Sequence, residues 1–141
     1  MTLLMLLLVS QALARPPETG GTSPRPEIRL QYVSSMSGCR ARLTSLSRAC
    51  AAIRRYKTFR FELGASDVDG DGRVDVVARS ADPNDCGTRG CLTRVFLNKN
   101  GKFIPSDIRV VSTGPVMPCD KNRHPGLLLT SPDQQGTCFT P

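Results

Sequence analysis

Apolar residues recur at helical spacing in the first half of the chain. The stripe advances in steps of four and three and consists of Cys39, Leu43, Leu46, Cys50, Ile53 and Tyr56. The arginines off this stripe are Arg40, Arg42, Arg48, Arg54 and Arg55. An apolar stripe with charged residues on the other face predicts one amphipathic helix over about residues 38–56.

From Phe59 onward the pattern changes to short alternating runs. The segments "TFRFEL", "RVDVVAR", "LTRVFL" and "DIRVV" are each typical of a β-strand. Asn100-Gly101 lies between the last two of these segments and is the preferred dipeptide of a tight hairpin turn. The pattern therefore predicts an antiparallel sheet whose strands follow the helix.

The two ends of the chain have a different character. Residues 1–14, "MTLLMLLLVSQALA", combine a short apolar run with small residues in an A-x-A pattern, which indicates a secretory signal peptide. Residues 15–37 are rich in Pro, Gly, Ser and Thr, so we expect a flexible segment there. Beyond Gly114 we expect loops, with Leu127 to Leu129 as the exception.

Composition adds the expectation of a single domain that depends on cross-links. The chain has 141 residues, six cysteines, one histidine and no tryptophan, with a formal charge of +7. We expect one domain over residues 38–141, of the α+β class: one helix packed on a small antiparallel sheet and stabilised by disulfides. No run after residue 14 approaches the roughly 20 apolar residues of a membrane span.

An exported protein is expected to hold its cysteines as disulfides. The six are Cys39, Cys50, Cys86, Cys91, Cys119 and Cys138. Within one continuous helix Cys39 and Cys50 would lie roughly 16 Å apart, at about 1.5 Å per residue, beyond the ~7 Å Cα separation that a bridge tolerates. "CGTRGC" favours a Cys86–Cys91 bridge. The prediction is then that the helix is tied to Cys119 and Cys138, in either of two pairings. A zinc site is disfavoured, because no pair has C-x-x-C spacing.

Four aspartates alternate with glycines and other residues in "DVDGDGRVDVV". Asp67, Asp69 and Asp71 occupy the first, third and fifth places of a calcium-loop pattern, and Gly72 supplies the sharp turn at the sixth. The backbone carbonyl of Arg73 would be the seventh-position ligand, with its side chain pointing outward, and Asp75 stands at the ninth. These residues predict a Ca²⁺ site. Magnesium fits less well, because it demands a stricter octahedron.

An EF-hand does not account for this loop. Its twelfth position is Ala78, and a strand pattern follows in place of a helix. The segment from about Phe59 to Phe103 instead resembles the FG-GAP or VCBS-type repeat, the calcium-binding blade of integrin-like β-propellers. The resemblance rests on "GASDVDGDGRVDVVARS" and "RVFLNKNGKF", and implies that the loop aspartates and the Arg73 carbonyl bind calcium. A propeller needs four to eight blades, so we expect a lone blade-like unit and no closed propeller.

The expected function is a calcium-stabilised binding module. Residues 15–60 carry a local charge of +8 and residues 61–141 a local charge of −1. This asymmetry favours an anionic surface or an acidic protein as partner. The residues expected to contact it are Arg40, Arg48, Arg54 and Arg55. Specific nucleic-acid binding is not expected, because interleaved aromatic residues are missing.

Two other functions compete with this interpretation. A secreted or periplasmic inhibitor, or an immunity-like protein, would have the same size and cysteine content. Catalysis is not expected: His124 lies in a loop-like context, no serine has a G-x-S-x-G setting, and oxidised cysteines are not nucleophiles. A hydrolase that uses the aspartate cluster is a weaker alternative, because all of its ligands would come from one short loop.

Overall fold

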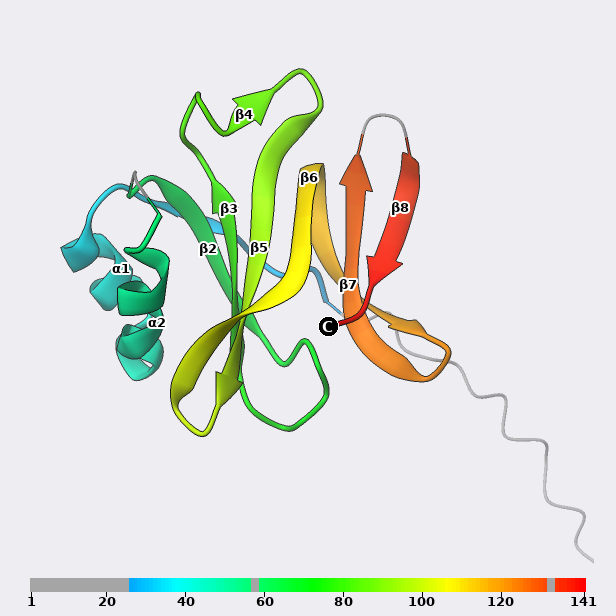
Figure 1. The fold of residues 1–141 in the computed structure, drawn as a ribbon, viewed down its shortest axis with the longest axis horizontal. Coiled ribbons are helices and arrows are strands. Elements are labelled where there is room, and N and C mark those ends of the chain that lie inside the picture. The colour runs from blue at the N-terminus through cyan, green and yellow to red at the C-terminus, as the bar shows by residue number, and fades with distance from the viewer. Residues whose placement is uncertain (1–25, 57–58, 132–133) are drawn as a thin grey trace, which may run out of the picture.

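Antiparallel strands make up most of the structure, a computed structural model that describes residues 26–56, 59–131 and 134–141 (Figure 1). The predicted signal peptide lies outside the described residues. The helical elements are α1 (Met36–Arg42), a 3₁₀ turn η1 (Thr44–Leu46) and α2 (Ser47–Ile53). The strands are β1 (Gln31–Val33), β2 (Phe61–Ser66), β3 (Asp75–Ser80), β4 (Cys86–Gly87), β5 (Gly90–Lys99), β6 (Lys102–Lys121), β7 (His124–Ser131) and β8 (Gln134–Phe139).

The strands form one antiparallel sheet in the order β1-β2-β3-β5-β6-β7-β8, with β4 paired to β5. Along this order neighbours in sequence are neighbours in space, apart from the short β4. Within the described residues β1 and β8 do not pair, so the sheet is open. The predicted small antiparallel sheet, stabilised by disulfides and not closed, is confirmed. The described parts of the four predicted strand segments overlap β2, β3, β5 and β6, although β2 and β3 each begin later than predicted.

Each face of the central strands packs against a separate group of apolar side chains. On β3, Val76 and Ala78 face the helices and Val77 faces the opposite side, in keeping with the two-residue period of a strand. Ile53 of α2 belongs to the first group and Leu127 of β7 to the second. The helices and the β7–β8 hairpin therefore lie on opposite sides of β2, β3 and β5 (Figure 1).

The β5–β6 hairpin turns at the predicted dipeptide. Asn100 and Gly101 have φ of 56° and 81°, the positive values of a type I′ turn. Lys99 pairs with Lys102 directly across the turn.

The prediction of one continuous helix over 38–56 was wrong. The chain leaves helical geometry at Leu43 (φ −109°, ψ 52°), passes through η1 and resumes as α2. The break folds α2 back beside α1, so that Cys39 and Cys50 have Cα atoms 6.0 Å apart and form a disulfide. The apolar stripe persists because the buried Cys39, Leu43, Cys50 and Ile53 still share one core.

The other cysteine predictions have mixed outcomes. Cys86–Cys91 is confirmed. Cys119 pairs with Cys138, and neither is tied to the helices, so the two predicted helix-to-tail connectivities were wrong. The wrong pairing follows from the wrong prediction of one continuous helix. Because the break at Leu43 brings Cys39 and Cys50 together, Cys119 and Cys138 are left to pair with each other. Cys119 lies on β6 and Cys138 on β8.

Two segments that we expected to be irregular are ordered in the sheet. Within 15–37, the described residues include β1 and the buried Ile28, whose N–H donates to the Val116 carbonyl at 2.8 Å. Beyond Gly114, β6 continues to Lys121, and β7 and β8 follow. Both expectations were therefore wrong for the described residues. Within those residues the structure contains no helix with the length and apolar character of a membrane span.

Candidate metal centre

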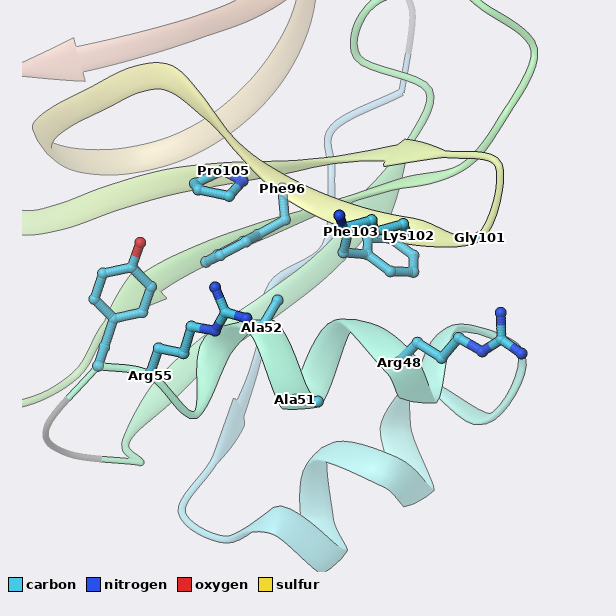
Figure 2. A pocket seen from close by; sticks show the side chains of 10 residues that line it. Arg48, Ala51, Ala52, Arg55, Phe96, Gly101, Lys102, Phe103 and Pro105 are labelled. Atoms are coloured by element: carbon cyan, nitrogen blue, oxygen red, sulfur yellow. The ribbon is translucent and has the colours of Figure 1, made fainter.

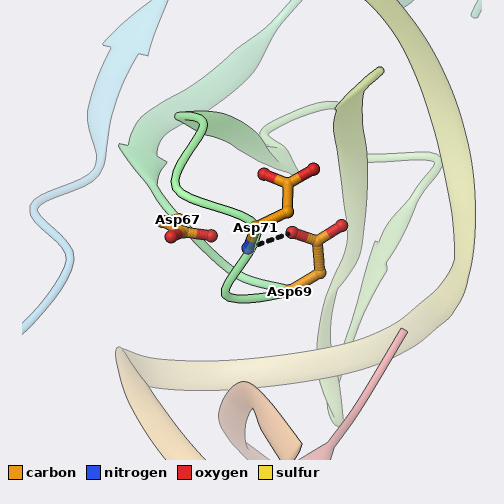
Figure 3. Close-up of side chains that lie close together, drawn as sticks. All are labelled: Asp67, Asp69 and Asp71. Atoms are coloured by element: carbon orange, nitrogen blue, oxygen red, sulfur yellow. Dashed lines mark hydrogen bonds between the residues drawn. The ribbon is translucent and has the colours of Figure 1, made fainter. Parts of the chain in front are cut away.

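The aspartate loop connects two adjacent strands of the sheet. Ser66, the last residue of β2, pairs with Asp75, the first residue of β3, so residues 67–74 form the tip of a hairpin. Asp67, Asp69 and Asp71 each present a carboxylate oxygen within 4.8 Å of the others (Figure 3). Three carboxylates at this spacing could hold a metal ion, and oxygen donors are those that calcium and magnesium prefer.

Hydrogen bonds inside the loop fix the positions of these carboxylates. Asp67 accepts from the N–H groups of Gly70 at 2.8 Å and Gly72 at 2.9 Å. The N–H of Asp71 donates to Asp69 at 3.1 Å, the bond drawn in Figure 3. Gly70 and Gly72 have φ of 76° and 82°, which residues with a side chain rarely adopt. The glycines thus permit the tight curl that brings the three carboxylates close to one another.

Asp75 occupies a different place from the other three aspartates. Its side chain is fully buried and accepts the N–H of Val68 and the N–H of Asn98, both at 2.8 Å. Burial raises its pKa, and the two N–H donors act in the opposite direction. Asp75 therefore ties the loop to the end of β5, next to the turn of the β5–β6 hairpin. It is not part of the three-carboxylate group, and its role as a metal ligand stays a prediction.

Arg73 also differs from the expectation in one respect. Its side chain does not point away from the loop: Nη1 lies 3.2 Å from Oδ2 of Asp71. Its N–H donates to Oδ1 of the same carboxylate at 2.9 Å. The proposed ligand is its backbone carbonyl, and that role stays a prediction.

Lys99 is a residue of this centre that the sequence pattern missed. Its Nζ donates to Oδ2 of Asp69 and lies 3.2 Å from Oδ2 of Asp71. Lys99 is the last residue of β5, which pairs antiparallel with β3. Strand pairing could have identified Lys99, because an antiparallel β3–β5 pair places the end of β5 beside the start of β3. The ammonium offsets part of the repulsion between these carboxylates.

Charge and hydrogen bonding shift two pKa values at this centre. The N–H of Arg73, followed by the Lys99 ammonium, holds the pKa of Asp71 below its ordinary value, although some desolvation opposes them. Hydrogen bonds to Asp69 and Asp71 raise the pKa of Lys99. At neutral pH Asp71 is thus a carboxylate and Lys99 an ammonium, so a metal ion would have to displace the ammonium or share the carboxylates with it.

The remaining candidate residues lie outside this centre. Arg40 and Arg54 are exposed on the helical segment, whereas Arg48 and Arg55 line one cavity beside α2. His124 is exposed at the start of β7, where we expected a loop, and it lines a small cavity together with Asp69 and Pro125.

No family model, curated protein or solved structure matches this chain. The function therefore has to be argued from the site itself.

Proposed function

We propose that the chain is an exported calcium-binding protein in which calcium stabilises the β2–β3 loop. The observation that carries the proposal is the group of three carboxylates, held within 4.8 Å of one another by hydrogen bonds to the loop backbone. An all-oxygen donor set on a glycine-containing loop suits calcium, which accepts irregular geometry and six to eight oxygen ligands. Arg73 and Asp75 would complete the set.

The same arrangement supports the proposed kinship with FG-GAP or VCBS-type repeats. Strands β2, β3, β5 and β6 are consecutive antiparallel neighbours, and a propeller blade is likewise a four-stranded sheet. The aspartate loop lies in the first hairpin of this set. We propose that the chain contains one such unit, with the helices covering one of its faces.

Export is supported by the cysteines. All six are paired in three disulfides. Such cross-links are typical of an oxidising environment outside the cytosol.

We further propose that calcium has a structural role and that the protein acts as a binding module for an anionic partner. Four arginines of the helical region, Arg40, Arg48, Arg54 and Arg55, are exposed. Within the described residues none of the four forms an ion pair with a protein carboxylate. Their charge is therefore available to a partner.

Thermal unfolding tests the calcium part of the proposal. The chain is compared in calcium and in chelator, alone and as the double variant Asp69→Ala and Asp71→Ala, with Asp107→Ala as a control that removes an exposed aspartate elsewhere. Calcium at 100 times its Kd should stabilise the parent and the control by about 2.7 kcal/mol. The double variant should not respond. An equal response in all three proteins would place the ion elsewhere, and no response in the parent would contradict calcium binding.

Retention on a sulfated polysaccharide matrix tests the anionic partner. Changing Arg40, Arg48, Arg54 and Arg55 to Gln should lower the salt concentration at which the protein elutes. The matched control removes the same charge from exposed positions outside the helices: Arg60, Arg109, Lys121 and Arg123. Equal elution of the two variants would contradict a role for the helical arginines.

A further inference from the structure

A cavity of about 450 Å³ lies between α2 and the β5–β6 hairpin (Figure 2). Its apolar lining comes from Ala51 and Ala52 on the helix side and from Phe96, Phe103 and Pro105 on the sheet side. Small-molecule sites in proteins usually have ~300–1,000 Å³, so this cavity has the size of a ligand site. It will be called the α2 groove.

The α2 groove lies where two small residues of α2 line the space beside two aromatic rings. Ala51 and Ala52 leave space that longer side chains would fill, while Phe96 and Phe103 are buried in the core beneath it. The rings of Phe96 and Phe103 therefore form a fixed apolar floor, whereas Ala51 on the helix is exposed to solvent.

One end of the α2 groove is lined by an edge-to-face aromatic pair. The ring of Tyr56 meets that of Phe96 edge-on, with the ring centroids 5.9 Å apart. The guanidinium carbon of Arg94 lies 4.1 Å from the centre of the Tyr56 ring. This cation–π contact holds Tyr56 in place and brings a further positive charge close to this end.

Three cations surround the apolar interior: Arg48, Arg55 and Lys102. The side chain of Arg55 extends into the space between α2 and Phe96 (Figure 2). Arg48 reaches the hairpin, since its Nη1 would lie 3.2 Å from a Cβ added at Gly101. Among the described residues that line the groove there is no carboxylate, and none of the three cations has an ion-pair partner in the described part of the chain.

Two other basic residues of the sheet are, by contrast, held in ion pairs. Arg79 is paired with Glu62, and Lys99 with two aspartates. Arginine is well suited to carboxylate recognition, because its planar guanidinium can donate two parallel hydrogen bonds. An apolar interior with unpaired cations at its rim is complementary to a molecule that has an apolar body and a negative group.

We infer that the α2 groove binds an alkyl carboxylate, a fatty-acid-like anion taken up as a free molecule. The alkyl chain lies against Phe96, Phe103 and the two alanines, and the carboxylate accepts hydrogen bonds from Arg55, Arg48 or Lys102. The inference deepens the proposed function by naming the class of anionic partner, and so rests on it. The volume of about 450 Å³ suits a single alkyl chain, and the cations at the rim suit its carboxylate.

Isothermal titration calorimetry of the calcium-loaded full chain tests the inference, with dodecanoate below its micelle concentration as the probe. The buffer contains no excess calcium, because free calcium precipitates alkyl carboxylates. We expect one dodecanoate per chain. Acetate, which has only the head group, and dodecyltrimethylammonium, which has the opposite charge, should bind at least about tenfold more weakly. Equal binding of dodecanoate and dodecyltrimethylammonium would overturn the inference, since the cations would then have no role.

Two pairs of variants locate the site. Arg55→Gln with Lys102→Gln should weaken dodecanoate binding at least about tenfold, because hydrogen bonds to a charged group are lost. Arg40→Gln with Arg54→Gln removes the same charge from arginines outside the groove and should bind like the parent. Ala51→Glu should abolish binding by placing a carboxylate in the groove, whereas Ser47→Glu, also exposed on α2, should not. Equal binding by both members of either pair would overturn the inference.

Failure of this inference can be told apart from failure of the proposed function. If dodecanoate does not bind but the protein is retained on the sulfated matrix through its helical arginines, the α2 groove is not the site and the anionic-partner proposal stands. If neither binds, both are wrong. Binding to anionic phospholipid vesicles provides the last test. If the protein binds vesicles but not dodecanoate, and Ala51→Glu does not change vesicle binding, the cations interact with a membrane surface. That result would overturn the inference.

Discussion

Asp75 is the aspartate on which the loop depends most for its position. It is fully buried and accepts one backbone N–H from the loop and one from the end of β5. A buried donor that loses its acceptor costs about 1–3 kcal/mol. Asp75→Ala leaves both N–H donors without an acceptor. Asp75→Asn keeps one acceptor oxygen, so only one N–H donor loses its partner and faces the amide NH₂.

Urea unfolding in chelator should therefore rank the variants at this position. We expect Asp75→Ala to lose more free energy of unfolding than Asp75→Asn, and both to lose more than Asp107→Asn, which changes an exposed side chain on β6. Each lost acceptor should cost about 1–3 kcal/mol. A stability of Asp75→Ala equal to that of the Asp107 control would show that these hydrogen bonds do not hold the loop.

Lys99 should compete with calcium for Asp69 and Asp71. Its ammonium contacts both carboxylates, so Lys99→Gln removes a positive charge from the place where a metal ion would lie. At a separation of ~4 Å in water this charge changes affinity roughly fivefold. Calcium titration should show that Lys99→Gln binds more tightly than the parent, while Lys102→Gln, its partner across the hairpin turn, changes little. Weaker binding by Lys99→Gln would contradict competition.

The Lys99–Asp71 contact also has a defined pH window in metal-free buffer. The pKa of Asp71 is lowered from its ordinary 3.8, so its stabilising contribution is present above that pH and is lost as the pH falls through the lowered value. The pKa of Lys99 is raised from 10.5, so its contribution is present below that pH and is lost as the pH rises through the raised value.

Unfolding midpoints of Lys99→Gln and the parent should thus differ by a constant amount from about pH 5 to pH 9. The difference should vanish in strong acid. The contribution of Asp75 to stability depends on pH in the opposite direction to that of Asp71. The raised pKa of Asp75 favours its protonated form in the folded state, so its contribution is lost as the pH rises through the raised pKa. A Lys99 effect that changes between pH 6 and pH 8 would contradict the assignment.

The sequence pattern predicted the carboxylates of the loop but not the residues from other strands that contact them. Alternating aspartates identified Asp67, Asp69 and Asp71 because their proximity is local: a tight turn brings positions two apart together whatever the rest of the fold does. Lys99 lies 28 residues from Asp71 and is brought to it only by the β3–β5 pairing. Contacts of that kind depend on register, which the spacing within the loop does not contain.

At the scale of the elements, the apolar stripe of the helical segment did not distinguish one helix from two. A break at Leu43 keeps the apolar residues facing one core while it reverses the direction of the chain. Spacing in steps of three and four is compatible both with one helix and with two short helices joined by a turn. The Cys39–Cys50 bridge excludes the single helix, because its Cα separation is 6.0 Å.

This bridge should contribute more to stability than Cys86–Cys91. It closes 11 residues of sequence and both of its cysteines are fully buried, whereas Cys86–Cys91 closes five and is partly exposed. In the chain-entropy account a 15-residue loop is worth ~3 kcal/mol and shorter loops less. Calorimetry of Cys39→Ala with Cys50→Ala and of Cys86→Ala with Cys91→Ala should show the larger drop for the first pair. The reverse order would contradict this ranking.

The strands beyond Gly114 were missed because of their prolines and glycines. Such residues usually mark loops, yet here they fall where the sheet is irregular. Gly114 and Pro115 lie in the register shift between Thr113 and Met117 of β6, and proline is tolerated at bulges because no ladder hydrogen bond is needed from it. Composition alone does not reveal which prolines and glycines end a strand and which lie at a bend within a strand.

At the scale of the whole molecule, the two packed faces explain how so small a chain carries a β-rich fold. Val76 and Val77 are adjacent in sequence, fully buried, and belong to different apolar groups. A run such as "DVVA", buried on both faces, was predicted as a strand. The sequence did not show that the C-terminal segment would cover the second face, since that segment was expected to be loops.

Strand β6 spans 20 residues and pairs with β5 along its first part and with β7 along its second. A single uninterrupted strand thus belongs both to the half that carries the aspartate loop and to the half that carries Cys119–Cys138. No peptide bond of β6 can be cut without removing a strand from one of these halves. We therefore expect the described part of the chain to unfold in a single transition, and a shortened version that ends within β6 should not fold.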